Sequence, residues 1–310
     1  MALISEEAKF LFDKEIGLGT WAWGDRIVWS YGRTHTDEDA KNAFDVALEA
    51  GIDFLDTAEV YGQGRSETLV GQFMKTAEKR VIVATKFMPF PWRVRRSAML
   101  KALRNSLGRL GLDKVDLYQI HWPLPFFPVE YWVEGLAEAK RLGLTGAVGV
   151  SNYNKNQMQR AYTVLAAHGI PLASNQVEYS LLDRKIEKNG VLQRSRELGV
   201  RIIAYSPLAK GMLTGKYTPE NPPPGVRGRQ YASKLKDIQP LIKVMTELGQ
   251  DLGGKTPAQI ALNWLICKGT LPIPGAKNAR QSEINSGAIG WRLSDEQVKV
   301  LDSASDKFTN

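Results

Sequence analysis

Six residues, each at the end of a short apolar run, recur along this chain at intervals of roughly 25 to 35 residues. They are Asp56, Lys86, His121, Ser151, Gln176 and Tyr205. A β-strand with its return helix and two loops takes roughly 30 residues or more, so this spacing predicts parallel strands that all point the same way. In a barrel of such strands the active site lies at the carboxyl ends. We therefore expect these six residues to meet at one rim.

Eight segments have the short, β-branched or apolar composition of strands. They are 16–21, 52–55, 81–85, 115–120, 147–150, 173–177, 202–205 and 270–273. Segments with apolar residues at helical spacing separate them, and Thr36 stands before one of these as a helix start signal. Strands this apolar have no face suited to water, which favours a closed (β/α)8 TIM barrel of the α/β class over the alternative, an open doubly wound sheet.

The chain of 310 residues is long for one domain but ordinary for a barrel of this class. We expect residues 1–310 to form a single domain. From Asn221 to Pro224 the chain is rich in proline, and Arg227 and Arg229 follow. This composition predicts a long loop between the seventh and eighth strands.

The formal net charge of +8 is compatible with nucleic acid, an acidic membrane surface or a phosphorylated small molecule as a partner. Lys and Arg are spread along the chain and form no long basic arm, so we expect no nucleic-acid binding. No apolar run approaches the 18 or so residues of a membrane span. We expect no membrane insertion and assign no metal site.

Cys267 is the only cysteine, so no intramolecular disulfide can form and a reducing compartment is permitted. The first twelve residues include Glu6 and Glu7 and lack the basic start and apolar centre of a secretory signal. The expected location is the cytoplasm. The oligomeric state is not encoded in any pattern, and a monomer is one option.

Two glycine-containing segments resemble phosphate-binding motifs without meeting their requirements. The segment from Gly17 to Ala22 has the glycine spacing of a dinucleotide fingerprint, but no helix is expected directly after it. The segment from Gly211 to Tyr217 is one residue short of a phosphate loop and has tyrosine where Ser or Thr would hold magnesium. Neither segment predicts a nucleotide site of those kinds.

Asp56, Tyr61, Lys86 and His121 follow the second, third and fourth predicted strands and suit the reduction of a carbonyl group. An alkoxide formed by hydride transfer needs a proton donor, and we expect Lys86 to lower the pKa of Tyr61 for this purpose. Asp56 would keep Lys86 charged, and His121 would orient the substrate oxygen. Each residue alone has an ordinary structural explanation, but four suitable types at matching rim positions favour catalysis.

The chain resembles the aldo-keto reductases over nearly its whole length. The matching blocks are Asp56-Thr-Ala-Glu-Val-Tyr61-Gly, Ala84-Thr-Lys86, Gln119-Ile-His121-Trp-Pro, Gly149-Val-Ser-Asn152, Ser174-Asn-Gln176-Val-Glu-Tyr179, Ala204-Tyr-Ser-Pro-Leu208 and Pro272-Ile-Pro-Gly-Ala-Lys277. The resemblance implies NADPH-dependent reduction of aldehydes or ketones, with Tyr61 as proton donor and Asp56, Lys86 and His121 as its partners.

The resemblance also implies how the cofactor is held. Ser151, Asn152 and Gln176 match the residues at the carboxamide, and Tyr205 matches the aromatic residue that stacks on the nicotinamide. The other positions assigned to the cofactor are Thr20, Trp21, Asp56, Ser206, Leu208, Gly211, Lys216, Arg227, Gly275, Lys277, Gln281 and Asn285. Arg229 is the alternative to Arg227. The family often has glutamate just before the asparagine, whereas Ile284 precedes Asn285 here.

Five tryptophans near the predicted rim indicate a pocket for apolar or aromatic carbonyl compounds. They are Trp21, Trp23, Trp29, Trp92 and Trp122. The rival hypothesis is a regulatory subunit that binds NADPH as a sensor, like the potassium-channel β subunits that the chain also resembles. Those subunits generally carry asparagine at the position of His121, which favours an enzyme.

Overall fold

The computed structural model describes residues 6–223 and 226–308, without the side chains of residues 226, 227, 229, 230 and 232. Within these ranges eight strands form one sheet in chain order, and each pairs in parallel with the next. They are β1 (Leu18–Gly19), β2 (Phe54–Asp56), β3 (Ile82–Phe87), β4 (Val115–Ile120), β5 (Thr145–Ser151), β6 (Leu172–Glu178), β7 (Arg201–Tyr205) and β8 (Leu271–Pro272). All eight predicted strands are present, with ends displaced by a few residues.

The sheet closes on itself through the segments around β1 and β8. The Gly17 N–H donates to the Pro272 carbonyl at 2.9 Å, and the Gly19 N–H donates to the Pro274 carbonyl at 3.0 Å. A Cβ atom on Gly19 would lie 2.8 Å from the Ile273 carbonyl oxygen, so this close approach needs glycine. These glycines therefore serve barrel closure and not a dinucleotide fingerprint.

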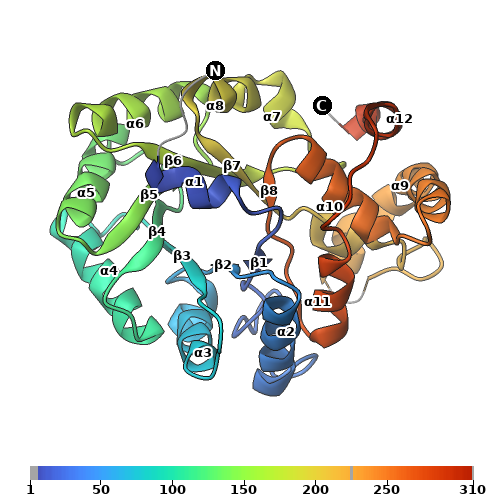
Figure 1. The fold of residues 1–310 in the computed structure, drawn as a ribbon, viewed down its shortest axis with the longest axis horizontal. Coiled ribbons are helices and arrows are strands. Elements are labelled where there is room, and N and C mark those ends of the chain that lie inside the picture. Colours follow the sequence, from blue (N-terminus) through green and yellow to red (C-terminus); the bar gives the residue numbers. More distant parts are fainter. Residues whose placement is uncertain (1–5, 224–225, 309–310) are drawn as a thin grey trace.

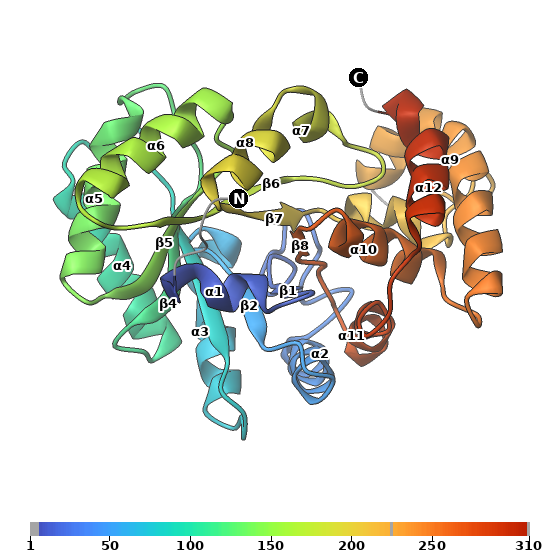
Figure 2. The same ribbon diagram turned by 45° about the horizontal axis from the view of Figure 1, so that its top comes forward.

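Helices surround the strands, as Figure 1 shows from one end of the barrel and Figure 2 from a tilted view. They are α1 (Glu6–Phe12), α2 (Asp37–Glu49), α3 (Arg65–Met74), α4 (Ser97–Leu110), α5 (Val129–Arg141), α6 (Lys155–Ala167), α7 (Lys185–Lys188), α8 (Val191–Leu198), α9 (Val226–Asp251), α10 (Pro257–Cys267), α11 (Ala279–Ser286) and α12 (Asp295–Ser305). Short 3-10 turns are η1 (Tyr61–Gly64), η2 (Ala209–Thr214) and η3 (Asp306–Phe308). Each βα unit thus adds one strand and returns the chain, as the spacing predicts.

The start of α2 shows how local sequence sets a helix boundary. Thr36 caps the helix, and the side chain of Asp39 accepts from the Thr36 backbone N–H in return. Phe44 and its alanine neighbours on the same face are buried against the barrel. Gly51 follows in the left-handed conformation with φ of 86°, which ends the helix.

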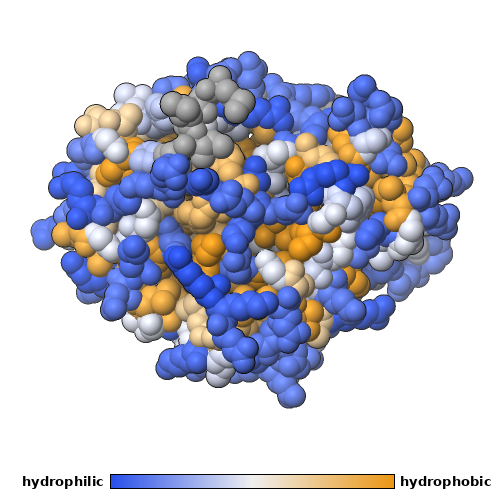
Figure 3. Space-filling model, in the orientation of Figure 1, coloured by the Kyte–Doolittle hydropathy of each residue, from blue (hydrophilic) through white to orange (hydrophobic). Residues whose placement is uncertain are grey.

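Two packed layers make up the interior. Apolar residues between the strands and the helix ring form most of the core, and a smaller cluster fills the barrel itself. Ala8 and Leu11 of α1 belong to this inner cluster, so α1 covers the amino ends of the strands. It lies across the barrel in Figure 1, and the same face in Figure 3 is largely hydrophilic with orange residues in smaller groups.

One prediction of local structure is wrong. The basic stretch that contains Arg227 and Arg229 is the beginning of helix α9, not part of a long loop. Between η2 and α9, the described residues 215–223, which include the start of the proline-rich segment, lack helix. The prolines mark where the helix cannot yet begin, and they carry no information on the structure of later residues. No helix within the described residues combines the length and apolar character needed to cross a membrane.

Candidate active site

The carboxyl ends of β2 and β3 bring together the acid, the lysine and the tyrosine that the sequence predicts. Lys86 Nζ lies 2.5 Å from Asp56 Oδ2 and 3.4 Å from Tyr61 Oη, and both charged side chains are buried. Lys86 also donates to the Thr57 carbonyl at 2.9 Å. A buried lysine stays charged only with such partners, so this arrangement holds one ammonium group beside one phenolic hydroxyl.

Tyr61 reaches this position from the first residue of η1, on the loop that follows β2. The indole ring of Trp21 stacks on it with ring centroids 6.1 Å apart. The imidazole of His121 meets the phenol edge-on at 5.7 Å between centroids. Three loops that lie far apart along the chain therefore converge on the side chain of Tyr61.

The pKa expected for Tyr61 is wrong in direction. Burial raises the pKa of the Tyr61 hydroxyl well above its usual range, and the negative charge of Asp56 raises it further. Lys86 does not reverse this effect because its charge is already paired with Asp56 at the shorter distance. Burial also lowers the pKa of Lys86, against the opposing effect of Asp56. Tyr61 is consequently held in its protonated form, the form that can donate.

His121 follows the last residue of β4 and is held by its backbone. Its N–H donates to the Phe87 carbonyl at 2.8 Å, and its carbonyl accepts from the Asn152 side chain at 3.1 Å. Burial and the charge of Lys86 lower the pKa of the ring to about 3. Its Nδ1 atom is buried and has no hydrogen-bond partner in the described part of the chain. The ring is therefore neutral near pH 7 and offers one donor and one acceptor.

Polar residues inside the barrel fix the Asp56 carboxylate. Its Oδ1 atom accepts from Gln176 Nε2 at 2.7 Å and from Gln119 Nε2 at 3.5 Å. Ser174 in turn donates to Gln119 at 3.4 Å. Neither Gln119 nor Ser174 was among the predicted site residues. The sequence feature that could have predicted them is the two-residue period of a strand. This period puts Gln119 on the same face as His121, and Ser174 on the same face as Gln176.

The residues predicted for the carboxamide end form a continuous hydrogen-bonded row. Ser151 Oγ donates to the Gln176 carbonyl at 2.8 Å, and Asn152 Nδ2 donates to Ser151 Oγ at 3.1 Å. Tyr205 Oη donates to Asn152 Oδ1 at 3.0 Å. Asn152 has φ of 63°, a conformation that asparagine tolerates better than most residues. The structure therefore brings four predicted residues from β5, β6 and β7 to one stretch of the rim.

After β7 the chain makes a tight turn that contains the next group of predicted residues. Ser206 and Gly211 have positive φ, and the Gly211 N–H donates to the Leu208 carbonyl at 2.9 Å. Lys216 follows the turn, and its ammonium lies 4.6 Å from the centroid of the Tyr217 ring. This turn is the 3-10 helix η2, so it also lacks the shape of a phosphate loop.

Four of the other residues assigned to the cofactor, namely Gly275, Lys277, Gln281 and Asn285, cluster around the start of α11. The Lys277 N–H donates to Gln281 Oε1 at 2.9 Å, and buried Asn285 donates to the Gly275 carbonyl at 3.4 Å. Lys277 Nζ donates to the Trp29 carbonyl at 3.0 Å. The structure thus brings all four predicted residues together. Arg227, assigned to the same cofactor, has its side chain outside the described residues, as has Arg229.

Thr20 and Trp21 follow β1 and complete the predicted set. Thr20 is buried, and its hydroxyl donates to the Asp56 carbonyl at 3.0 Å. Trp21 donates from Nε1 to Asp25 at 3.0 Å. Trp23, by contrast, is fully buried and donates to the Ala276 carbonyl at 2.8 Å, so its proposed place in the pocket wall is wrong. The sequence alone did not distinguish Trp23 from Trp21, because both lie in a loop, where the alternation of buried and exposed residues in a strand does not apply.

The charged and polar groups at the rim fit a dinucleotide cofactor that carries phosphates. Lys216 and Lys277 supply positive charge at two points of the rim, and the first turn of α11 presents backbone amides, which favour anions. The row of amide and hydroxyl groups from Ser151 to Tyr205 suits a carboxamide. The Nδ1 atom of His121, which has no partner among the residues that the structure describes, shows that the site retains unused hydrogen-bonding capacity. The residues present therefore fit an NADP-type cofactor.

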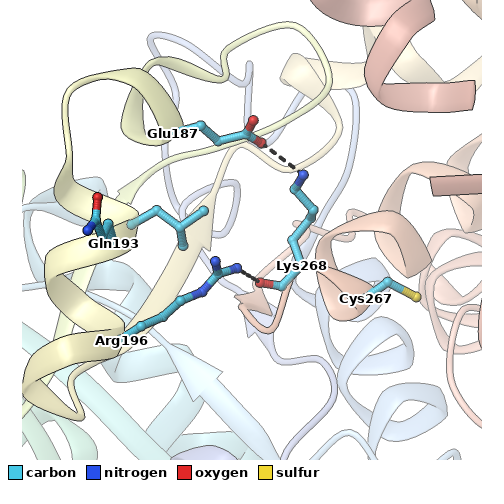
Figure 4. Close-up of a pocket in the computed structure, with 6 residues that line it drawn as sticks. Glu187, Gln193, Arg196, Cys267 and Lys268 are labelled. Carbon is cyan, nitrogen blue, oxygen red and sulfur yellow. Dashed lines mark hydrogen bonds and ion pairs between the residues drawn. The ribbon is translucent and has the colours of Figure 1, made fainter. Parts of the chain in front are cut away.

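Two hollows on the surface contain none of the predicted site residues. One, of about 260 Å³, is lined by Glu187, Leu192, Gln193, Arg196, Cys267 and Lys268 (Figure 4). The other, of about 320 Å³, is lined by Met74, Lys79, Arg80, Val81, Leu112, Lys114 and Asp116. Figure 4 shows Lys268 paired with Glu187, at 3.5 Å, and Arg196 donating to the Lys268 carbonyl, at 2.9 Å. Neither hollow is the site at the carboxyl ends of the strands.

Comparison with known proteins agrees with the fold. The model of the aldo/keto reductase family matches residues 15–306. The chain is 41% identical to the chloroplastic pyridoxal reductase of Arabidopsis thaliana over 94% of its length and 82% of that protein. These two matches cover nearly every element of the barrel.

Solved structures give the same result. The glycerol dehydrogenase of Gluconobacter oxydans superposes with a TM-score of 0.80 at 27% identity, over 95% of this chain and 92% of its own. An aldo/keto reductase of Klebsiella pneumoniae in complex with NADP and acetate gives 0.74 at 29% identity, over 93% and 90%. The chain belongs to the aldo/keto reductase family and is an oxidoreductase with a (β/α)8 fold. The expectation of an NADP cofactor agrees with the Klebsiella complex.

Proposed function

We propose that this protein, as a single barrel domain, reduces aldehydes or ketones to alcohols with NADPH, and that Tyr61 donates the proton. The observation that carries this proposal is the distance of 3.4 Å between the hydroxyl of Tyr61 and the ammonium of Lys86, which is itself paired with Asp56. NADPH supplies the hydride when it is bound. The residues of the chain supply the proton and the orientation.

The raised pKa of Tyr61 supports this assignment, although it differs from the sequence expectation. A donor must hold its proton until negative charge develops on the substrate oxygen. The phenolate left after donation then has Lys86 beside it, and this attraction favours the product side of the transfer. Asp56 keeps the lysine charged, and the neutral ring of His121 can donate a hydrogen bond to the same oxygen.

The rim loops support a substrate with an apolar or aromatic body. Large apolar side chains are exposed on the loops that follow β1, β3 and β4, at the carboxyl ends of the strands. They are Ile27, Val28, Trp92, Val94, Trp122 and Phe126. Exposed apolar groups gathered at the mouth of a site favour ligands with matching surfaces. The Arabidopsis relative is named for pyridoxal, an aromatic aldehyde, which makes this compound a candidate for the present chain.

Residues toward the cofactor are proposed on the same basis. Ser151, Asn152 and Gln176 would hold the carboxamide, and Tyr205 would lie against the nicotinamide. Lys216 and Lys277 would pair with phosphates, since both carry positive charge at the rim. The cytoplasmic location expected from the sequence remains a prediction, as does the choice between Arg227 and Arg229.

The test is to mix the protein with NADPH and a panel of aldehydes and to follow the absorbance of the reduced nicotinamide. We expect oxidation of NADPH with pyridoxal and benzaldehyde, and slower oxidation with glyceraldehyde 3-phosphate, whose charged group matches the exposed apolar side chains of these loops less well. Tight binding of NADPH with no oxidation by any carbonyl compound would instead support the sensor hypothesis. Binding of neither NADPH nor any aldehyde would overturn both.

A further inference from the structure

Glu59 and Arg93 form an ion pair directly beside the proposed site. Arg93 donates to Glu59 through both terminal nitrogens, at 2.5 Å to Oε1 and 3.0 Å to Oε2. The exposed fractions are 8% for the Glu59 side chain and 22% for Arg93. A bidentate pair of this kind fixes geometry as well as charge. Its shielding from water distinguishes it from the weak ion pairs of the surface.

The pair links the two segments that carry the tyrosine and the lysine. Glu59 precedes Tyr61 by two residues on the loop after β2, and Met88 follows Lys86 by two residues at the end of β3. The Met88 N–H donates to Glu59 Oε1 at 2.7 Å, and Arg93 donates to the Met88 carbonyl at 2.9 Å. The carboxylate of Glu59 therefore bonds to the backbone beside Lys86.

Arg93 extends this connection to the wall of the mouth. Its guanidinium lies 4.9 Å from the centroid of the Phe87 ring and 5.4 Å from that of Phe90. Phe90 stacks on Trp92 with centroids 4.5 Å apart, and Trp92 is 72% exposed. The guanidinium of Arg93 thus links the end of β3, the loop after β2 that carries Tyr61, and the stacked pair of Phe90 and Trp92.

We propose that Glu59 and Arg93 are positioning residues that set the distance between the Tyr61 hydroxyl and the Lys86 ammonium and hold the Phe90–Trp92 segment at the mouth. This inference rests on the proposed function for its effect on turnover. Tyr61 begins a turn in which Gly62 and Gln63 have left-handed φ values of 54° and 57°, so the turn alone has little intrinsic preference for its shape. The link to β3 supplies the constraint that the turn lacks.

The central experiment compares Glu59→Gln with a matched control, Glu130→Gln. Glu130 also pairs with an arginine through two hydrogen bonds, of 2.7 Å and 2.6 Å to Arg160, but it joins α5 to α6 on the outside of the barrel. We expect Glu59→Gln to lower kcat about tenfold or more, with KM and NADPH affinity changed less than about threefold. Glu130→Gln should leave kcat within about twofold of the wild type.

A purely structural role would lower the melting temperature of Glu59→Gln and leave kcat unchanged in the folded protein, and this result would overturn the proposal. Equal losses of kcat in the two variants would overturn it as well. If Glu59→Gln does not fold, Arg93→Lys replaces it, since lysine retains the charge but not the bidentate geometry. An unchanged kcat in Arg93→Lys would likewise contradict the role.

Hydrogen exchange tests the link without relying on turnover. We expect the amide of Met88 and the segment 87–96 to exchange at least about tenfold faster in Glu59→Gln than in the wild type or Glu130→Gln. Unchanged exchange would show that the pair does not hold the two segments. If the wild type oxidises NADPH with no carbonyl compound, the proposed function fails, and hydrogen exchange still decides whether this link exists.

Discussion

Two clusters of charged side chains illustrate opposite uses of ion pairs in this barrel. One joins α7, α10 and α12, where Arg184 lies 2.7 Å from Glu187 and 3.4 Å from Asp302, and Lys268 lies 3.0 Å from Asp302 and 3.5 Å from Glu187. The other lies at the rim, where Lys86 pairs with Asp56 alone among the described carboxylates. The first cluster gives Lys268 two acidic partners and Arg184 three, since Asp306 also lies 3.1 Å from Arg184, whereas the second cluster gives its cation one.

The difference shows what a site requires. In the outer cluster the charges satisfy one another, so it can stabilise the packing of three helices and has little left for a ligand. At the rim the lysine retains a contact with Tyr61, and His121 retains a buried ring nitrogen without a partner among the described residues. Buried polar groups that lack a full set of partners lower the stability of the fold, but they can bind and react with a ligand. Substitutions in the two clusters should therefore have opposite consequences.

The largest effect is expected for Tyr61→Phe. Full activity in this variant would contradict the view that the rim cluster serves catalysis. The substitution removes the donated proton and one contact of Lys86, and little else. We expect kcat to fall by about 100-fold to 10,000-fold, while NADPH binding and the free energy of unfolding change little. The measurement is steady-state NADPH oxidation together with fluorescence titration of NADPH. Turnover equal to that of the wild type would remove Tyr61 from its assigned role.

Arg184→Met should have the opposite effect, a loss of stability without a loss of turnover. The guanidinium also donates to the Asp302 carbonyl at 2.6 Å and to Ser305 Oγ at 3.0 Å, so its loss removes these bonds and leaves Lys268 to balance the charges of Glu187 and Asp302. We expect the free energy of unfolding to fall by about 3 kcal/mol, with kcat unchanged at a temperature where the variant is folded. Urea unfolding and the aldehyde assay measure the two quantities. A specific loss of kcat would mean that the two clusters are not independent.

The neutral state of His121 predicts a pH dependence of stability. The unfolded chain binds a proton at this residue below about pH 6.5, whereas the folded chain does so only near pH 3. Protonation therefore favours the unfolded state, and stability decreases as the pH falls from about 6.5 toward 3. We expect His121→Asn to reduce this slope by about 1.4 kcal/mol per pH unit. Urea unfolding from pH 7 to pH 4 tests it, with His168→Asn on the outer surface as the control.

The smallest effect concerns the cofactor end of the rim. Lys277→Ala should weaken NADPH binding by about tenfold and leave NADH binding nearly unchanged, because a charge-assisted bond to the extra phosphate is lost. Fluorescence titration with both cofactors measures this difference. Lys243→Ala in α9 serves as a control for loss of one positive charge. Equal weakening of the two cofactors would show that Lys277 does not read the extra phosphate.

Regular patterns made much of the fold predictable. The strand segments and the helix start at Thr36 follow from local composition, and the convergence of Asp56, Lys86 and His121 follows from the direction of parallel strands. The loops were harder. Trp21 and Trp23 look alike in sequence, but one stacks on Tyr61 and the other is buried in the core. Periodicity gives no information where the backbone is irregular.

Contacts between residues far apart in the sequence were the second feature that the sequence did not predict. Nothing in the sequence links Glu59 to Arg93, which are 34 residues apart and lie on different loops. The same holds for Gln119 and Asp56, which meet across the barrel interior. Such pairs depend on how neighbouring strands are staggered and on where each loop folds back. Local sequence constrains neither quantity.

The sequence by itself determined the order of strands and helices, the positions of the polar strand ends and the resemblance to the aldo-keto reductases. These features depend on local composition and on spacing along the chain. Tertiary structure alone decided the ionisation of the site. Burial raises the pKa of Tyr61 and lowers that of His121, and the short distance from Lys86 to Asp56 leaves the lysine little power to reverse the first shift. Desolvation and distance are properties of the folded molecule, so no pattern of residues along the chain could have fixed their balance.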